Sequence, residues 1–593
     1  MWLGFEKTKI QFSEITTSIL YFSFMHPNWF SIHHLAPAVF LLLLCTFCPN
    51  LSHSQGSYIP FNRDYYHKID RYEILQKRTN PSFNTGFKPY RRDLVASFLD
   101  SLAADQNLIE SKADRFNLDY LSQDSWEFSS RSIPKSKKPF LKSLYQRPGD
   151  FAYYEGEDFG IHLSPVIYLS GGSETDNSRN PAQLSRGLVI RGSVDKKVGF
   201  YTYLTTSEVY FPSWVKNYAS YNGAVPGEGF WKEYNDSGYS YFSALGHVAF
   251  QITKHIEVQV GHDRNFAGEG YRSFEISDFS NPYMFVKFNT KVWRFQLTNL
   301  WTQMTADVFY NRGRPTDGRY PQKYFAYNRL GMNVGKSMNF GFFSSIMTDK
   351  INFNYFNPFI FLRWVEQQQG TPDKVMLGLD GKWIFMPGME LYGQFALDEF
   401  VFNEFFGIDG KGSKRNKYGA QLGYKYINVF GISNLDFQLE WNQARPYTFQ
   451  EKVDYQSYTN WRTPLTHPRG ANFREFVGII RYQPLPRLDI NLTGFYQLFG
   501  TDESAEVNWG GDLLKNRLEG SPTGLFENYI GQGIENQVVQ SNLTASYMLR
   551  HNFFIDASHY FRRRTAADLT TPETSQFVSL GFRWNFIRPD FNY

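Results

Sequence analysis

The stretch SQFVSLGFRWNF, Ser575–Phe586, alternates between apolar and polar side chains, one residue after another. A strand points successive side chains to opposite faces, so this stretch predicts one apolar face and one face of small or polar groups. The residues expected on the apolar face are Val578, Leu580, Phe582, Trp584 and Phe586. The pattern suits a strand with lipid outside and a wet lumen inside, although the last strand of a soluble sandwich would alternate in the same way.

The bulk composition favours the membrane alternative. Aromatic residues make up 18% of the 593-residue chain, yet the mean hydropathy is only −0.44. Aromatic girdles and alternating strands produce this combination, whereas helical membrane proteins are apolar throughout. The net charge of +4 is nearly balanced and no Lys/Arg run longer than three residues occurs, so we expect no nucleic-acid partner.

A signal peptide is predicted within the first 54 residues. The apolar run Leu35–Phe47 has the length of a signal-peptide core and is too short for a spanning helix. Ser52-His53-Ser54 offers a cleavage site of small residues, and Met25 is the expected true start. Cleavage there would remove Cys45 and Cys48, leaving a thiol-free chain exported through the periplasm to the bacterial outer membrane.

Residues 55–150 are predicted to form a small, mainly helical domain. Tyr65–Leu75 and Tyr90–Ala104 carry apolar residues three and four apart, which is the helical spacing. We expect this domain either below the barrel in the periplasm or in its mouth, as a plug. The alternative is that these residues form a flexible leader segment without a fold of its own.

Residues 151–593 are predicted to form a transmembrane antiparallel β-barrel of about 18 strands, an all-β fold. From Phe159 onward the apolar period is two, in segments of about the ten residues that a tilted strand needs to cross a bilayer. Tight turns such as Asp195-Lys196-Lys197 alternate with long loops such as Phe211–Gly238, which is the arrangement of outer-membrane barrels. To keep this alternation, we assign Thr348–Asp373 to one outer loop that could fold inward and narrow the lumen.

Such a barrel is expected to close and to enclose space. An unpaired backbone amide costs several kcal/mol in hydrocarbon, so a spanning sheet leaves no free edge. About eighteen strands make a ring too wide for side chains alone to fill. The lumen should therefore hold water, or a plug made by the loops or by the helical domain.

The sequence offers no catalytic or metal-binding pattern. No GxSxG, HExxH or P-loop motif stands out, and the histidines after the predicted signal peptide are scattered singly. We therefore expect a non-enzymatic protein with no cofactor and no metal.

The loop that follows Phe211 is the predicted binding site. It interleaves aromatic rings with Lys, Asn, Glu and Gly, which suits a sugar-binding surface, because rings contact sugar C–H faces while polar groups bind hydroxyls. The alternative is that several of these rings belong to the outer interfacial girdle. The candidate binding residues are Trp214, Tyr218, Tyr221, Trp231 and Tyr234.

Five further segments of the chain bear on its family. They are YIPFNRDYYHKIDRYEIL (Tyr58–Leu75), GHDRNFAGEGYRSF (Gly261–Phe274), NPFIFLRWVE (Asn357–Glu366), LYGQFALDEF (Leu391–Phe400) and HPRGANFREFVGIIRYQPLPRL (His467–Leu488). Together they resemble Bacteroidetes outer-membrane proteins of the capsule-assembly Wzi type. The resemblance implies an eighteen-stranded barrel with a helical periplasmic element that holds capsular polysaccharide at the cell surface. It implies no catalytic motif.

Three hypotheses about function follow. The first is a non-enzymatic outer-membrane barrel that binds or anchors capsular polysaccharide. The second is a structural barrel subunit of a secretion, gliding or other envelope complex, and the third is a porin. The expected partners are outer-membrane lipid, capsular polysaccharide and envelope-complex proteins.

Overall fold

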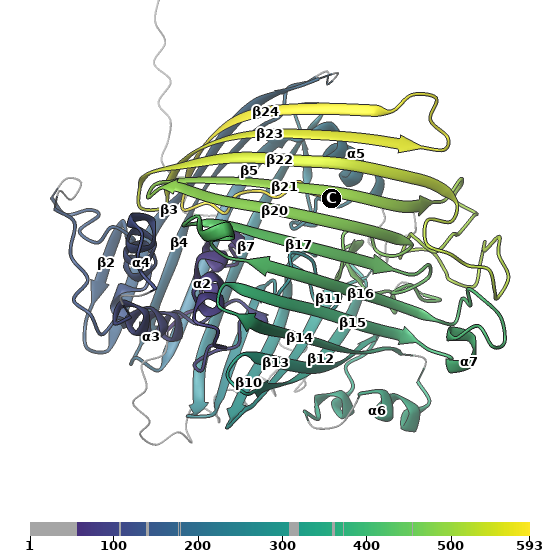
Figure 1. The fold of residues 1–593 in the computed structure, drawn as a ribbon, viewed down its shortest axis with the longest axis horizontal. Coiled ribbons are helices and arrows are strands. Elements are labelled where there is room, and N and C mark those ends of the chain that lie inside the picture. Colours follow the sequence, from purple (N-terminus) through teal and green to yellow (C-terminus); the bar gives the residue numbers. More distant parts are fainter. Residues whose placement is uncertain are drawn as a thin grey trace, which may run out of the picture. The chain divides into compact units, whose positions relative to one another are not determined.

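A computed structural model of the protein describes residues 56–593, apart from 106–107, 138–141, 176, 178, 307–319, 359–361, 372 and 454. The predicted signal peptide and both cysteines lie outside the described residues. Within the described residues, eighteen long antiparallel strands form a closed barrel, as the alternation predicted. The barrel closes where β24 pairs with β3, for example at Gly581 and Ser170 (Figure 1).

The strands follow one another around the wall in chain order. The wall consists of β3 (Phe159–Glu174), β4 (Ala182–Val194), β5 (Val198–Tyr210), β7 (Gly238–Thr253), β8 (Ile256–Asp263), β10 (Tyr283–Val292), β11 (Phe295–Thr305), β12 (Gln322–Val334), β13 (Met338–Thr348), β14 (Lys374–Met386), β15 (Met389–Glu399), β16 (Lys417–Tyr426), β17 (Leu435–Ala444), β20 (Phe473–Leu485), β21 (Leu488–Thr501), β22 (Ile534–Arg550), β23 (Phe553–Ala566) and β24 (Glu573–Trp584). Short strands add local pairs: β1 (Phe87–Lys88), β2 (Ala152–Glu155), β6 (Lys232–Tyr234), β9 (Phe266–Ala267), β18 (Thr459–Asn460) and β19 (Thr463–Pro464).

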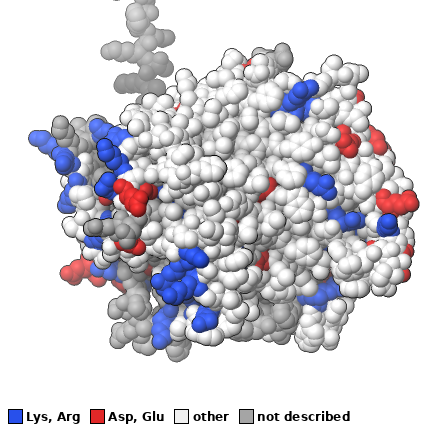
Figure 2. Space-filling view, in the orientation of Figure 1, with Lys and Arg blue, Asp and Glu red and all other residues white. Residues whose placement is uncertain are grey.

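The predicted alternation separates the two faces of the wall. On β24, Val578 is 54% exposed and Leu580 is 66% exposed, whereas Arg583 is buried against Asp556 on the lumen side. On the face shown in Figure 2, charged side chains gather toward the two ends, and the wall between them is largely uncharged. This is the surface that a bilayer requires.

Phe586 departs from the prediction that it would face lipid. β24 ends at Trp584, and Asn585 has a positive φ of 52°, which turns the chain into the barrel. The Asn585 side-chain amide donates to the Pro165 carbonyl at 2.8 Å and holds this turn. Phe586 consequently stacks on Tyr168 inside the lumen, with ring centroids 4.9 Å apart.

The connections alternate between a short-turn end and a long-loop end, as predicted. β4 and β5 are joined by a tight turn in which Asp195 and Lys196 have positive φ. The loops at the other end carry most of the additional helices. These are α5 (Ser213–Asn222), η3 (Phe353–Phe356), α6 (Leu362–Gln369) and α7 (Phe402–Phe405), while η4 (Val429–Gly431) lies at the short-turn end.

The loop between β13 and β14 does not narrow the lumen. Leu362 and Val365 of α6 pack against Ala326, Ile346 and Val375. These three strand residues have the parity opposite to the lumen-facing side chains of β12, β13 and β14, so α6 covers the outside of the wall (Figure 1). The suggestion that this loop folds inward is therefore wrong, because its apolar residues match the apolar outer face.

The N-terminal helices confirm the predicted helical region. They are α2 (Arg63–Leu75), α3 (Arg92–Ala103), α4 (Lys112–Asp124) and η2 (Trp126–Phe128). The Asn62 side chain caps α2 by accepting the Tyr65 N–H at 3.1 Å. Among the described residues, no helix is long and apolar enough to cross a membrane. Apolar residues of all three α-helices share one cluster with Met548 and Phe554 of the wall, so the helices pack on the barrel.

Candidate functional site

Several segments of the chain occupy the lumen. Among the described residues they include residues 56–91, with α2 and β1, the β8–β10 loop, the β17–β20 loop and the C-terminal segment 585–593. In the outer half, the two loops contribute Phe274, Phe449 and Tyr458 to an apolar cluster with lumen-facing wall residues such as Phe325 and Phe343. The barrel thus has a folded interior in place of a simple wet lumen.

Ion pairs fix α2 to the inner wall. The Lys382 ammonium lies 2.6 Å from a Glu73 carboxylate oxygen and 3.0 Å from one of Glu269. Arg71 pairs with Asp436 of β17 at 3.2 Å. Lys382 and Asp436 lie near the short-turn ends of their strands, so α2 closes the barrel at that end.

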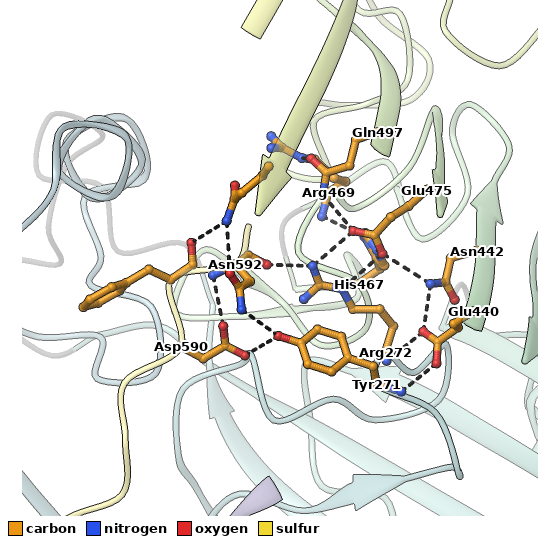
Figure 3. Close-up of polar contacts among 12 residues, drawn as sticks. Tyr271, Arg272, Glu440, Asn442, His467, Arg469, Glu475, Gln497, Asp590 and Asn592 are labelled. Atoms are coloured by element: carbon orange, nitrogen blue, oxygen red, sulfur yellow. Dashed lines mark hydrogen bonds and ion pairs between the residues drawn. The ribbon is translucent and has the colours of Figure 1, made fainter. Parts of the chain in front are cut away.

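An ion pair between Arg272 of the β8–β10 loop and Glu475 of β20 lies inside the barrel (Figure 3). Arg272 Nη2 is 3.1 Å from Glu475 Oε1, and both side chains are at most 4% exposed. Glu475 also accepts hydrogen bonds from Gln497 Nε2 at 2.7 Å and from Asn442 Nδ2 at 3.2 Å. A buried carboxylate needs several donors, and this one has them.

His467 completes the shell around Glu475. Its Nε2 lies 2.7 Å from Glu475 Oε2, and its Nδ1 accepts the Arg469 backbone N–H at 3.1 Å. Burial lowers the pKa of His467 to about 4, against the opposing influence of Glu475, so the imidazole is neutral at pH 7. Because Nδ1 is the acceptor, Nε2 carries the proton that is donated to Glu475.

Glu440 fixes the β8–β10 loop. Its carboxylate accepts the backbone N–H groups of Tyr271 at 2.6 Å and Arg272 at 3.0 Å. The Tyr392 hydroxyl and the Asn442 amide donate to the same carboxylate, at 2.8 Å and 2.9 Å. The loop backbone is therefore held from the wall, which places the Arg272 guanidinium beside Glu475.

The C-terminal segment binds to the same network (Figure 3). The Tyr271 hydroxyl donates to Asp590 at 2.6 Å, and Arg272 Nη2 donates to the Asn592 carbonyl at 2.6 Å. Gln540 of β22 donates to the Asn592 side-chain oxygen at 3.1 Å. Arg272 therefore links the wall, an inward loop and the C-terminal segment.

A cavity of about 240 Å³ remains beside the C-terminal segment. Its wall combines aromatic rings, small hydroxyl and amide groups, and charges of both signs. Representative lining residues are Tyr203, Tyr241, Glu228, Arg264, Arg481 and Asp590. Within the described part of the chain, no group of three His, Cys, Asp or Glu side chains could hold a metal ion.

The structure brings three of the five predicted binding residues together. Trp214 is 7% exposed, and its indole N–H donates to the Phe591 carbonyl at 3.0 Å. Tyr218 and Trp231 pack against the same apolar cluster, which also contains Tyr593. These rings hold α5 over the C-terminal segment inside the barrel, so Trp214 does not lie in a lipid-facing girdle.

The other two predicted residues lie outside that cluster. Tyr221 is 67% exposed, and its hydroxyl lies 3.3 Å from a carboxylate oxygen of Asp512. Tyr234, in β6, packs against Tyr210 with ring centroids 5.8 Å apart. Of the five rings, Tyr221 is the one most available to a ligand at the long-loop end.

The sequence-based search for a site missed the network around Glu475. Arg272 and Glu475 are separated by 203 residues along the chain, so no short motif joins Arg272 to His467 and Glu475. A signal was nevertheless present, because all three lie in the segments Gly261–Phe274 and His467–Leu488 that carry the family resemblance.

The geometry defines a plugged transmembrane β-barrel of the outer-membrane type. The structure is similar to that of Wzi from Escherichia coli, an outer-membrane protein involved in group 1 capsule assembly and described as a carbohydrate-binding β-barrel. The TM-score is 0.53 at 12% identity, over 90% of this chain and 100% of that one, a likeness that shows the fold. OprD from Pseudomonas aeruginosa gives a TM-score of 0.38 at 10% identity, over 71% of this chain and 94% of that one. No protein-family model and no curated protein sequence matches the chain.

Proposed function

We propose that this protein binds surface polysaccharide at the long-loop end of its barrel and holds it at the cell surface, without catalysis. The observation that carries the proposal is the filled lumen, in which inward segments of the chain are held by buried ion pairs such as Arg272–Glu475. A barrel filled in this way suits binding better than solute conduction. The likeness to a barrel described as carbohydrate-binding supports the same function.

The proposal includes the capsule-assembly role and family that the sequence segments suggest. It also includes export through the periplasm, with the short-turn end and α2 on the periplasmic side. The long loops would then face the outside, where Tyr221 and its polar neighbours are available to a glycan.

A deletion strain tests the proposed function. We expect it to lose cell-attached capsule while total polysaccharide output persists, because the protein retains the polymer and does not make it. Unchanged capsule retention would contradict the proposal. Stoichiometric protein partners after mild detergent extraction would instead favour the structural-subunit alternative.

Conductance in planar bilayers separates the proposal from a porin. We expect the intact protein to give little or no steady current, because α2 and the inward loops occupy the lumen. A variant that lacks residues 587–593 is the matched comparison, since it should enlarge the 240 Å³ cavity without changing the wall. Large, stable channels from the intact protein would support the porin alternative.

A further inference from the structure

Two neighbouring long loops fold against the outside of the barrel wall. They join β13 to β14 and β15 to β16, four strands that follow one another in the wall. Both loops therefore leave the wall at the same end and on the same side of the barrel, where Figure 1 shows α6 and α7. Their contacts with the wall lie on its lipid-facing side.

The β13–β14 loop is held on the outer face by Trp301 of β11. The Trp301 indole N–H donates to the Tyr355 carbonyl at 3.0 Å, and the indole stacks on Phe356 with ring centroids 5.2 Å apart. Trp301 follows Leu300, which belongs to the apolar cluster of the lumen, so the indole points out of the barrel. Phe353, whose ring lies 6.0 Å from that of Phe356, is left exposed on this outer surface.

The β15–β16 loop is held on the same face by Phe405 of α7. The Phe405 ring lies 5.9 Å from that of Tyr418 in β16, which in turn lies 5.5 Å from that of Phe395 in β15. Phe395 follows Gln394, whose side chain binds the inward β8–β10 loop, so Phe395 points out of the barrel. α7 is therefore attached to the lipid-facing surface.

The segment Phe400–Ile408 presents apolar side chains and hides its one charge. Glu404 is buried and accepts a hydrogen bond from Arg415 Nε at 3.1 Å. This is the reverse of the arrangement expected at a surface in water, and exposed apolar patches of this kind mark interaction sites. The exposed large apolar side chains of the segment are Phe400, Phe402, Phe405, Phe406 and Ile408.

The rest of the β15–β16 loop fixes the position of this segment. The backbone N–H groups of Glu527 and Asn528, in the β21–β22 loop, donate to the carbonyls of Lys411 and Gly412 at 2.8 Å and 2.9 Å. The β15–β16 loop is thus bound to the wall at one side and to a neighbouring loop at the other. The exposed rings are therefore a fixed feature of the surface.

We propose that these two loops are embedded in the lipid leaflet at the long-loop end, where the rings of Phe353, Phe402 and Phe406 contact acyl chains. That leaflet is the outer one in the orientation proposed above. The apolar patch is continuous with the lipid-facing wall through Trp301 and Tyr418, so the bilayer that covers the wall also reaches the patch.

The composition of α6 fits the headgroup level of the same leaflet. Leu362 and Val365 pack on the wall, whereas Trp364 is exposed next to Arg363, which pairs with Glu366 at 2.9 Å. Tryptophan together with charged side chains is typical of the membrane–water interface. The embedded loops anchor one side of the barrel at a fixed depth. This inference goes beyond the proposed function and does not depend on a glycan.

Fluorescent labels at single positions test the inference in vesicles. The variants Phe353→Cys, Phe402→Cys and Leu518→Cys are made in the full-length chain with Cys45 and Cys48 changed to serine, and each carries a polarity-sensitive fluorophore. The proteins are folded into phosphatidylcholine vesicles with and without a lipid that has a doxyl quencher near the headgroup end of its acyl chain. Circular dichroism checks that each variant keeps the strand content of the parent protein.

Leu518 is the matched control. It lies in the β21–β22 loop at the same end of the barrel, and it is 61% exposed against 62% for Phe402. Its loop packs toward the lumen through Leu513, which belongs to the apolar cluster inside the barrel. A label at position 518 should therefore remain in water.

We expect the doxyl lipid to quench the labels at positions 353 and 402 by about half or more, because interfacial side chains enter the acyl boundary by about 5–10 Å. Iodide in the aqueous phase should quench them several-fold less than it quenches the label at position 518. Equal quenching by iodide at all three positions would overturn the inference. Energy transfer between donor-labelled and acceptor-labelled copies that persists in excess lipid would also overturn it, because a second copy would then cover this face. Either result leaves the proposed function intact.

Discussion

The two faces of β23 and β24 are stabilised by different interactions. The outer face presents Val578 and Leu580 to the bilayer, each more than half exposed when lipid is left out of account. The inner face pairs Arg583 with Asp556 at 2.7 Å and binds the C-terminal segment through Tyr560 and Phe577. Each outer residue contributes to stability on its own, through transfer of its side chain into lipid. The inner residues contribute to stability only when both members of an interacting pair are present.

The largest effect should come from separating a matched pair in the lumen. Glu475→Leu leaves the Arg272 guanidinium buried and unpaired, and it removes the acceptor of His467, Gln497 and Asn442. We expect a loss of about 3–5 kcal/mol in the free energy of unfolding. Urea titration of the protein folded into lipid vesicles measures it.

The double variant Arg272→Met/Glu475→Leu is the control for that prediction. Removal of both charges avoids the unpaired guanidinium, so this variant should be more stable than Glu475→Leu alone. If the double variant is no more stable than Glu475→Leu alone, the ion pair does not act as a unit and the contrast between the faces is weakened.

A charge on the lipid-facing side should have the next largest effect. Leu580→Arg places a guanidinium in the apolar band, and we expect it to lower the free energy of unfolding by about 2–4 kcal/mol in vesicles. Leu580→Ala controls for the loss of the leucine side chain. An arginine that is tolerated as well as alanine would show that Leu580 does not face lipid.

The outer face and the strand order could be predicted from the sequence, and much of the interior could not. The period of two depends on neighbouring residues alone, so it shows which side chains face lipid as far as Trp584, where β24 ends, and fails at Phe586, where the chain turns inward. The interior depends on contacts between distant segments, such as Tyr271 with Asp590. The wall also carries apolar side chains such as Phe343 and Met347 of β13 on its lumen face, where alternation predicts polar ones; there they share an apolar cluster with residues of the inward loops.

The candidate site shows the same division. An aromatic-rich loop identified Trp214 and Tyr218, but the sequence does not show that their partners are Phe591 and Tyr593, more than 370 residues away. The composition of this loop could suggest that its aromatic rings bind a sugar. Only the structure shows which rings are used to hold α5 and which, such as Tyr221, remain exposed.

The smallest of these effects should come from protonating the interior while the lipid face is unchanged. Burial lowers the pKa of His467 to about 4, below an ordinary value of about 6.5. His467 therefore contributes stability that is present above pH 6.5 and is lost as the pH falls toward 4. Between pH 7 and pH 5 we expect a loss of about 2 kcal/mol in the free energy of unfolding, measured by urea titration in vesicles. His467→Gln keeps a donor for Glu475 but does not titrate, so its stability should change less over the same range; an equal pH dependence in both proteins would show that other groups control the acid response.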